Sequence, residues 1–480
     1  MVTADRPLRI ALLSYRSKPH CGGQGVYVRH LSRELAALGH RVEVFSGQPY
    51  PELDPGPGLT RIPSLDLYRD SDPFRTPHWH EYRDWADVLE TAMMWGGAFP
   101  EPLTFSLRVR QVLAGRAGDF DVVHDNQGLG YGLLGIGRPG PGRPPLPLVA
   151  SIHHPISVDR RIDLAGLGPL DRLSRRRWYG FVRMQARVAR HIARAGPLIT
   201  VSTSSRRDIC RDFKVPPDRV RVIPLGVDTR VFRPGQAPRV PGRIIAVASA
   251  DSAIKGIATL LRAVAKLVTD RDAHLVIVGR PGPGTERLAA QLSIADRVTF
   301  THGLNDQAFS ALLGSAQIAV VPSLYEGFSL PALEHMASGT PLVASRSGAL
   351  PEVTGEAAAL VTPGDSDELA AVLRRLQDSP AERAALADRA LRRIGERFAW
   401  PAVAQATVAQ YREAQDREAR DRETPDRETR DREARDREAQ DREAQDREAQ
   451  DREAQDREAR DRADRRREAR DRRATGTASC

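Results

Sequence analysis

The stretch RIALLSYRSKPHCGGQGVYVRHLSRELAALGHRVEVFSG, residues 9–47, decides the fold class. It opens with a short apolar run over residues 9–14, passes through a glycine-containing turn, and continues with apolar side chains at helical spacing. A second apolar run follows at once over residues 41–47. A strand, a helix and a strand in this order are the unit of parallel sheets, so the sequence predicts an α/β fold.

The same alternation continues through the first half of the chain. Four more apolar runs have the character of buried strands, and they cover residues 121–126, 147–154, 197–205 and 220–228. Strands that alternate with helices in this way predict one parallel, doubly wound sheet.

A second series of strand candidates begins after a Pro- and Gly-rich segment near residues 226–242. Its members are apolar runs separated by helical patterns, at residues 243–249, 273–279, 297–303, 318–323 and 341–345. A helical pattern around residues 381–412 closes this part. We therefore predict two doubly wound, Rossmann-like domains, residues 1–225 and 226–412, facing a cleft at the carboxyl ends of their strands, where such folds bind ligands.

Residues 413–480 differ in composition from the rest of the chain. The unit DREAQ or DREAR recurs at a five-residue period, without any large apolar side chain. Glu–Arg contacts four residues apart can support a helix there, but no apolar stripe is present to build a core. We predict a charged, solvated, low-complexity tail, with a protein-docking arm as the alternative.

Composition narrows the class of protein. The formal net charge is +9, and three cysteines stand far apart at positions 21, 210 and 480, which argues against a disulfide framework and for a reducing compartment. No run of about 18 apolar residues is present, so we expect a cytoplasmic protein. The basic character suits anionic partners, but nucleic acid has only this charge in its favour and is not expected.

Several residues have the type and position of ligand-binding groups. Gly22 and Gly23 fall in the turn before the first helix, where backbone N–H groups can meet a phosphate. Lys255 stands at the start of a helix, where a cation is favoured only beside an anion. His153 follows an apolar strand, which places it at the expected ligand-binding edge. A tight turn, a solvated lysine and a hydrogen-bonded loop histidine are the alternatives.

The stretch SLYEGFSLPALEHMASGTPLVAS, residues 323–345, contains two glutamates eight positions apart. Pro331 suits the first turn of a short helix and Gly339 its end, so Glu334 should lie on that helix and Glu326 in the loop before it. Carboxylates accept hydrogen bonds from vicinal hydroxyls such as those of ribose or sugars. A solvated helix face is the alternative. The isolated His and Asp residues indicate no metal site.

The string EGFSLPALEHMASGTPLVAS resembles the nucleotide-sugar signature of glycosyltransferase family 4, which has the GT-B fold. Four further blocks at family spacing resemble it too, namely CGGQGVYVRHLSRELAALGHRVEVFS, ITVSTSSRRDI, VIPLGVDTRVFRP and KGIATLLRAVAKL. The resemblance covers the chain to about residue 412 and excludes the tail.

The resemblance implies a role for each candidate residue. Glu334 would accept hydrogen bonds from the ribose of the donor, and Glu326 would contact the sugar to be transferred. Lys255 would neutralise the diphosphate with help from backbone groups at Gly22 and Gly23, and His153 would sit at the acceptor side. The loop between the glutamates would supply backbone N–H groups or packing, from Gly327, Phe328, Ser329 and Leu330.

The activity implied by the resemblance is that of a retaining hexosyltransferase. It would move a hexose from a UDP- or GDP-sugar, GDP-mannose among them, to a hydroxyl of a glycan, lipid or small molecule. The leaving phosphate itself would take the acceptor proton, and no metal or other cofactor is expected. The alternative is a non-catalytic GT-B-like protein that only binds a nucleotide sugar.

Two positions depart from the family pattern. Ala250 stands where many members have an arginine for the diphosphate, and Lys18 and Arg16 are the candidates to replace it. Gln24 and Gly25 stand where members that bind a phosphorylated inositol often have asparagine, so that acceptor is not supported.

The basic, aromatic stretch of residues 171–194 allows two interpretations. Its arginines at positions 183, 187, 190 and 194 share one helical face, and apolar residues from Trp178 to Ile192 lie mostly on another. It is either a domain helix with its apolar face in the core, or an amphipathic helix at the anionic inner face of a membrane, where the acceptor would be a lipid.

Overall fold

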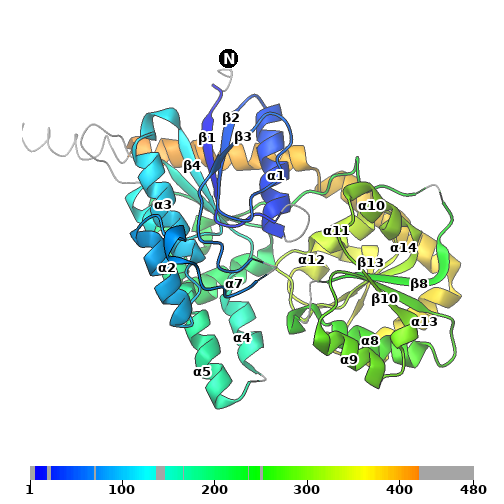
Figure 1. Cartoon of the computed structure of the whole chain (residues 1–480). Helices are drawn as coiled ribbons and strands as arrows, with labels where there is room; N and C mark the ends of the chain where they lie inside the picture. Colours follow the sequence, from blue (N-terminus) through cyan, green and yellow to red (C-terminus); the bar gives the residue numbers. More distant parts are fainter. Residues whose placement is uncertain are drawn as a thin grey trace, which may run out of the picture. The chain divides into compact units, whose positions relative to one another are not determined.

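The computed structural model describes residues 6–18, 23–69, 72–136, 146–165, 167–235, 237–248 and 252–420. These residues form two parallel sheets with helices on both faces (Figure 1), which confirms the predicted α/β class with two Rossmann-like domains. Both sheets belong to one compact unit, Met1–Arg417. Gly22, Ala250 and the repeat segment beyond residue 420 lie outside the described residues.

The first sheet contains seven parallel strands in the order β3-β2-β1-β4-β5-β6-β7. They are β1 (Arg9–Ser14), β2 (Arg41–Ser46), β3 (Gly58–Arg61), β4 (Val122–Asn126), β5 (Leu148–Ile152), β6 (Leu198–Thr200) and β7 (Val220–Val222). The sequence predicted all of them except β3, a strand of four residues at the sheet edge with no buried side chain.

The second sheet contains six parallel strands in the order β10-β9-β8-β11-β12-β13. They are β8 (Val240–Val247), β9 (His274–Val278), β10 (Val298–Thr301), β11 (Ala316–Val321), β12 (Leu342–Ser345) and β13 (Ala358–Val361). In both sheets the strand order reverses beside the first strand of its own series, between β1 and β4 and between β8 and β11. Open parallel sheets bind ligands at the carboxyl ends of strands beside such a reversal.

The helices cover both faces of the sheets. Those associated with the first sheet are α1 (Gly23–Ala37), α2 (Trp85–Trp95), α3 (Glu101–Ala114), α4 (Ser157–Ala165), α5 (Pro169–Trp178), α6 (Phe181–Ala195) and α7 (Thr203–Phe213). Those of the second are α8 (Ile257–Leu267), α9 (Pro283–Gln291), α10 (Asp306–Ser315), α11 (Leu330–Ala337), α12 (Leu350–Thr354), α13 (Ser366–Asp378) and α14 (Pro380–Arg397).

The stretch of residues 171–194 divides between α5 and α6. The apolar face of α6 is buried, with Val182, Val188 and Ile192 in the core beneath the first sheet, while Arg183 and Arg187 point to solvent. The interpretation of this segment as a domain helix therefore holds for α6, and its apolar face is not free to meet a membrane.

Residues 400–417 are helical and pack on the first sheet, although they follow the whole of the second. Val403, Ala404, Val408 and Ala414 are buried in one core with side chains of β1 and α1. The hydroxyl of Tyr411 lies 2.7 Å from Nδ1 of His124 in β4. The last described helix thus completes the core that the first strands begin.

Candidate active site

Lys255 and Glu326 meet at the strand-order reversal of the second sheet. Lys255 ends a short 3-10 helix (Ala253–Lys255) beyond β8, and Glu326 lies in the loop after β11. The Nζ atom of Lys255 donates a hydrogen bond of 2.8 Å to Oε1 of Glu326, and the hydroxyl of Ser323 donates one of 2.7 Å to the same oxygen. Lys255, which we expect to bind a diphosphate, and Glu326, which we expect to bind a sugar, are therefore in direct contact.

Gly256 allows this approach. Its φ of +65° is in the left-handed region, and a Cβ there would lie 2.0 Å from the carbonyl oxygen of Pro322 in the loop after β11. Only glycine fits such a contact without moving the backbone. Lys255 can therefore lie beside Glu326 only because glycine follows it in the sequence.

Ser329 begins α11 in a strained conformation. Its φ of 88° is left-handed, its side chain makes no capping hydrogen bond, and its buried hydroxyl has no partner among the described residues. A non-glycine residue held there costs on the order of 1–3 kcal/mol. The first N–H groups of a helix also favour negative charge. The start of α11 therefore has hydrogen-bond donors of the kind that an anion would require.

Glu334 lies in the second turn of α11 and is half-buried. Within the described part of the chain, no group donates a hydrogen bond to its carboxylate. Burial raises the pKa of Glu334 to about 7, and the negative charge of Asp306 adds to that rise. A half-buried carboxylate without a protein partner is a suitable acceptor for the hydroxyls of a ligand.

His153 follows β5 and is held as a neutral imidazole. Its Nε2 lies 2.7 Å from Oδ1 of Asn126, and its backbone N–H donates to the side chain of Gln127 at 2.8 Å. The ring of Tyr27 packs edge-on against it, with 4.7 Å between the ring centroids. Burial lowers the pKa of His153 to about 3, so the ring carries no charge at neutral pH.

The pKa of His154 is shifted in the opposite direction from that of its neighbour. Its burial disfavours the protonated form, but the carboxylate of Asp159, 3.0 Å from Nε2, and the nearby charge of Glu326 raise its pKa above the ordinary value. The pKa values of two adjacent histidines at the end of one strand are therefore shifted in opposite directions. No spacing in the sequence distinguishes them, because Asp159 approaches from α4.

The loop that contains Glu326 rests on the end of the first sheet. The carbonyl oxygen of Gly327 accepts hydrogen bonds from the hydroxyls of Ser202 at 2.7 Å and Ser205 at 3.0 Å. A Cβ on Gly327 would lie 2.9 Å from the carbonyl oxygen of His153 and 2.7 Å from Cβ of His154. This close approach brings His153 together with the residues of the second sheet.

Most of the predicted site residues converge here. Lys255, Glu326, Gly327, Phe328, Ser329, Leu330 and Glu334 follow one another along the edge of the second sheet and into α11. Gly23 at the start of α1 joins them, since a Cβ there would lie 3.9 Å from Cδ1 of Leu330. Sequence reasoning missed the contact roles of Asn126, Gln127, Ser202 and Ser205, although the two serines lie in the block ITVSTSSRRDI.

Arg16 is engaged elsewhere in this structure. Its guanidinium donates to the carbonyl oxygen of Tyr68 at 3.0 Å and lies 3.5 Å from the carboxylate of Glu101. These contacts hold the charge of Arg16 at Glu101. Lys18 is therefore the other candidate to replace the arginine that is absent at position 250.

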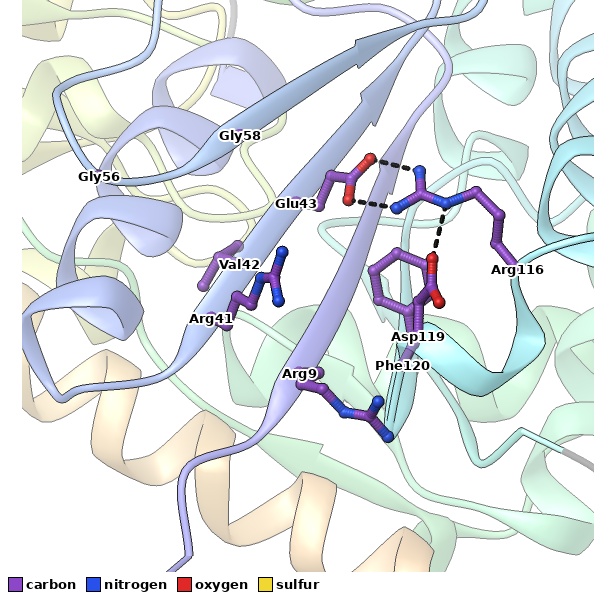
Figure 2. Close-up of a pocket in the computed structure, with 9 residues that line it drawn as sticks. All are labelled: Arg9, Arg41, Val42, Glu43, Gly56, Gly58, Arg116, Asp119 and Phe120. Carbon is purple, nitrogen blue, oxygen red and sulfur yellow. Dashed lines mark hydrogen bonds and ion pairs between the residues drawn. The ribbon is translucent and has the colours of Figure 1, made fainter.

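A cavity of about 410 Å³ lies at the opposite edge of the first sheet (Figure 2). Arg9 and Arg41 stand at the amino ends of β1 and β2, and Arg116 forms ion pairs with Glu43 and Asp119 across the opening (Figure 2). Because ligands of doubly wound folds bind at carboxyl ends of strands, this cavity is separate from the candidate active site.

Two Rossmann-like sheets are the fold of the GT-B class of glycosyltransferases. Here they meet where Gly327 contacts His153, beside Lys255, Glu326 and Glu334. Family models match both halves: "Glycosyltransferase Family 4" over residues 21–231 and "Glycosyl transferases group 1" over residues 241–379. An MMP alpha-(1->4)-mannosyltransferase of Mycolicibacterium hassiacum is 58% identical over 406 residues, 83% of this chain and 97% of the relative. The chain therefore belongs to glycosyltransferase family 4, and it is a hexosyltransferase.

More distant relatives and solved structures agree. A D-inositol 3-phosphate glycosyltransferase of Saccharomonospora viridis is 31% identical over 437 residues, 83% of this chain and 93% of the relative. Sucrose-phosphate synthase from Thermosynechococcus elongatus has the same fold, with a TM-score of 0.64 at 23% identity over 85% of this chain and 98% of its own. The glycosyltransferase WaaG of lipopolysaccharide biosynthesis has a TM-score of 0.58 at 18% identity, over 84% and 99% of the chains.

Proposed function

We propose that the chain transfers a mannosyl group from a nucleoside-diphosphate sugar, GDP-mannose first among the candidates, to O4 of a sugar acceptor. The transferred sugar and the linkage are taken from the 58%-identical relative, whose name specifies an alpha-(1->4)-mannosyltransferase. The main support for the donor is the start of α11. An uncapped, strained serine lies there on the loop that also contains Glu326, and its hydroxyl has no partner among the described residues.

The diphosphate would be held by charge and dipoles. Lys255 would exchange its contact with Glu326 for the phosphate oxygens, and the N–H groups at the start of α11 would complete their coordination. These groups stabilise the negative charge that develops on the leaving diphosphate. In this proposal they supply what a metal would otherwise supply, so none is required.

The two glutamates and His153 would position the sugars. Glu334 would accept hydrogen bonds from the ribose, and Glu326, released by Lys255, would accept them from the mannose hydroxyls. His153 and the backbone around Gly327 would fix the reacting sugar beside the acceptor, because both lie where the two sheets meet. Bringing the reactants together in this way supplies much of the rate by orientation.

The reaction would retain the configuration at the anomeric carbon. The bond from C1 to the diphosphate oxygen breaks, the bond from C1 to O4 of the acceptor forms on the same face, and the acceptor proton passes to the leaving phosphate. An α-linked product formed from an α-configured nucleotide sugar has this stereochemistry. No protein carboxylate is assigned as a nucleophile.

The donor can be tested before the acceptor. A bound ligand raises the melting temperature by mass action, so GDP-mannose should stabilise the chain more than UDP- or ADP-glucose. Incubation with GDP-mannose and a mannoside with a free O4 should then release GDP, and the anomeric proton signal of the product should identify an α linkage. Release of no nucleotide, or a β-linked product, would contradict the proposal.

The proposal includes peripheral contact with an anionic membrane. Within the described segments, no helix is both long and apolar enough to cross a bilayer. Since α6 buries its apolar face, such contact requires another surface of the first domain.

A further inference from the structure

Helix α2 carries three exposed large apolar side chains, although its Ala86 and Met94 are buried. Trp85, Val88 and Trp95 are 63%, 56% and 67% exposed, and Ala92 is exposed between them. At 100° per residue these four positions fall within about 80° of one another around the helix axis. They form one apolar face about 15 Å long.

The inner face of the same helix contains two charged side chains beside Ala86, Thr91 and Met94. Asp87 and Glu90 are 0% exposed, and Arg108 of α3 donates hydrogen bonds of 2.6 Å to both carboxylates. A surface helix ordinarily turns its charged side chains to solvent and its large apolar side chains inward. Because buried carboxylates must stay with their arginine, the ion pairs fix the orientation of α2 and hold the tryptophans outside.

Helix α5 adds exposed apolar and basic side chains beside α2. It has no buried residue, and Leu170 and Leu173 are 85% and 52% exposed. A Cβ on Gly97, just beyond α2, would lie 4.0 Å from Cβ of Arg177 at the end of α5. Figure 1 shows the two helices on the same side of the first sheet.

The charge of α5 indicates what covers this surface. Its last turn contains three consecutive exposed arginines, Arg175, Arg176 and Arg177. Tryptophan and leucine side chains suit the interface between headgroups and acyl chains, and arginines suit lipid phosphates. The repeat segment beyond residue 420 contains no large apolar residue that could pack on the tryptophans.

We propose that the exposed faces of α2 and α5 form a docking surface for an anionic lipid bilayer. Trp85, Val88 and Trp95 enter the headgroup region while the α5 arginines pair with lipid phosphates. This surface rests on the peripheral membrane contact included in the proposed function, and it moves that contact from α6 to α2 and α5.

Co-sedimentation of the full chain with vesicles tests the surface. The unchanged chain should sediment with vesicles of phosphatidylcholine and phosphatidylglycerol, and much less with phosphatidylcholine alone. The variant Arg175→Gln/Arg176→Gln/Arg177→Gln should bind the anionic vesicles roughly a hundredfold more weakly, because each arginine near such a surface contributes several-fold. Trp85→Ser/Trp95→Ser should lose binding to the same vesicles without a change in its melting temperature.

A matched variant separates this surface from general charge. Arg262→Gln/Arg287→Gln/Arg297→Gln removes three exposed arginines from the second domain and should bind like the unchanged chain. Equal loss in both arginine variants, or no binding of the unchanged chain, overturns the surface. A dimer that Trp85→Ser/Trp95→Ser converts to a monomer in light scattering overturns it too, because a second copy would then cover α2.

The transfer reaction distinguishes this inference from the proposed function. Mannosyl transfer in solution to a soluble acceptor should be the same in the tryptophan variant and the unchanged chain. If the tryptophan variant and the α5 arginine variant both keep vesicle binding and mannosyl transfer, the docking surface is rejected and the proposed function stands. Absence of transfer in the unchanged chain rejects the proposed function and leaves the result with vesicles standing.

Discussion

The imidazole of His153 lies 2.7 Å from the amide oxygen of Asn126, and the amide nitrogen of Asn126 is buried without a partner among the described groups. With the amide in this orientation, Nε2 of His153 carries the proton and Nδ1 is left as an acceptor. Asn126 thus sets which ring nitrogen can receive a hydrogen bond from a sugar hydroxyl.

We expect Asn126→Ala to lower turnover on the order of tenfold, since His153 loses the hydrogen bond that selects its tautomer, a loss of about 1–2 kcal/mol. Asn126→Asp should raise the pKa of His153 above its present value of about 3, because a carboxylate favours the charged ring. Ser151→Ala is the control, since that hydroxyl lies 2.7 Å from Nε2 of the neighbouring His124. A pH–rate profile that gains a new protonation step in Asn126→Asp, and not in Ser151→Ala, would support this role. Identical profiles in all three chains would contradict it.

Lys255→Ala should lower turnover by a hundredfold or more, because the leaving diphosphate loses a charge placed before the reaction starts. Lys255→Arg should restore part of the activity. Lys266→Ala is the matched control, since the ammonium group of that lysine donates hydrogen bonds to Ser366 and Asp367 at the surface. Steady-state GDP release measures all three, and near-normal turnover in Lys255→Ala would remove this lysine from the mechanism.

Donor affinity should fall in acid through the ionisation of Glu334. Its pKa of about 7 lies above the ordinary 4.5, so the carboxyl is mostly ionised at pH 8 and mostly protonated at pH 6. If ribose binding requires the carboxylate, the Kd for GDP-mannose should rise about tenfold between these pH values. Glu334→Gln should bind more weakly and with little dependence on pH. Calorimetry at pH 6 and pH 8 decides, and an equal pH response of both chains would rule out Glu334 as its source.

Arg108→Ala should destabilise the fold by about 3–5 kcal/mol, because it leaves Glu90 buried without its cation and Asp87 paired with Arg83 alone. Arg83→Ala removes the other partner of Asp87. Because the Arg83 side chain is 42% exposed, this substitution should lower the free energy of unfolding by about 1 kcal/mol or less. Unfolding in denaturant measures both free energies. Comparable effects of the two substitutions would show that the buried ion pairs do not hold α2 in place.

The sequence was sufficient for most of the fold because most strands and helices of the two series have a strong apolar period. It missed β3 and β13, which have four residues each and lie at sheet edges, where few side chains are buried. The outward tryptophans of α2 could not be predicted either, because their position depends on Arg108 of another helix.

The candidate site was predicted as a set of residues, and the structure supplies their relationships. Glu326 and Glu334 lie in the loop and on the helix where Pro331 and Gly339 place them. The contact of Lys255 with Glu326, the docking of Gly327 on His153 and the opposite shifts in the pKa values of His153 and His154 are tertiary. The pattern of residues along a chain reveals the period of each helix or strand. It does not reveal which loops from different strands come into contact.

The packing of residues 400–414 on the first sheet has a consequence for biosynthesis. All seven strands of that sheet have been made once Val222 has been translated, but the side chains that cover it, from Trp400 to Ala414, are translated only after the whole second sheet. Part of the apolar core of the first domain therefore stays exposed to water while the whole second sheet is synthesised. Ribosome-bound chains ending before Trp400 should expose this surface to chaperones, and release of the complete chain should close it.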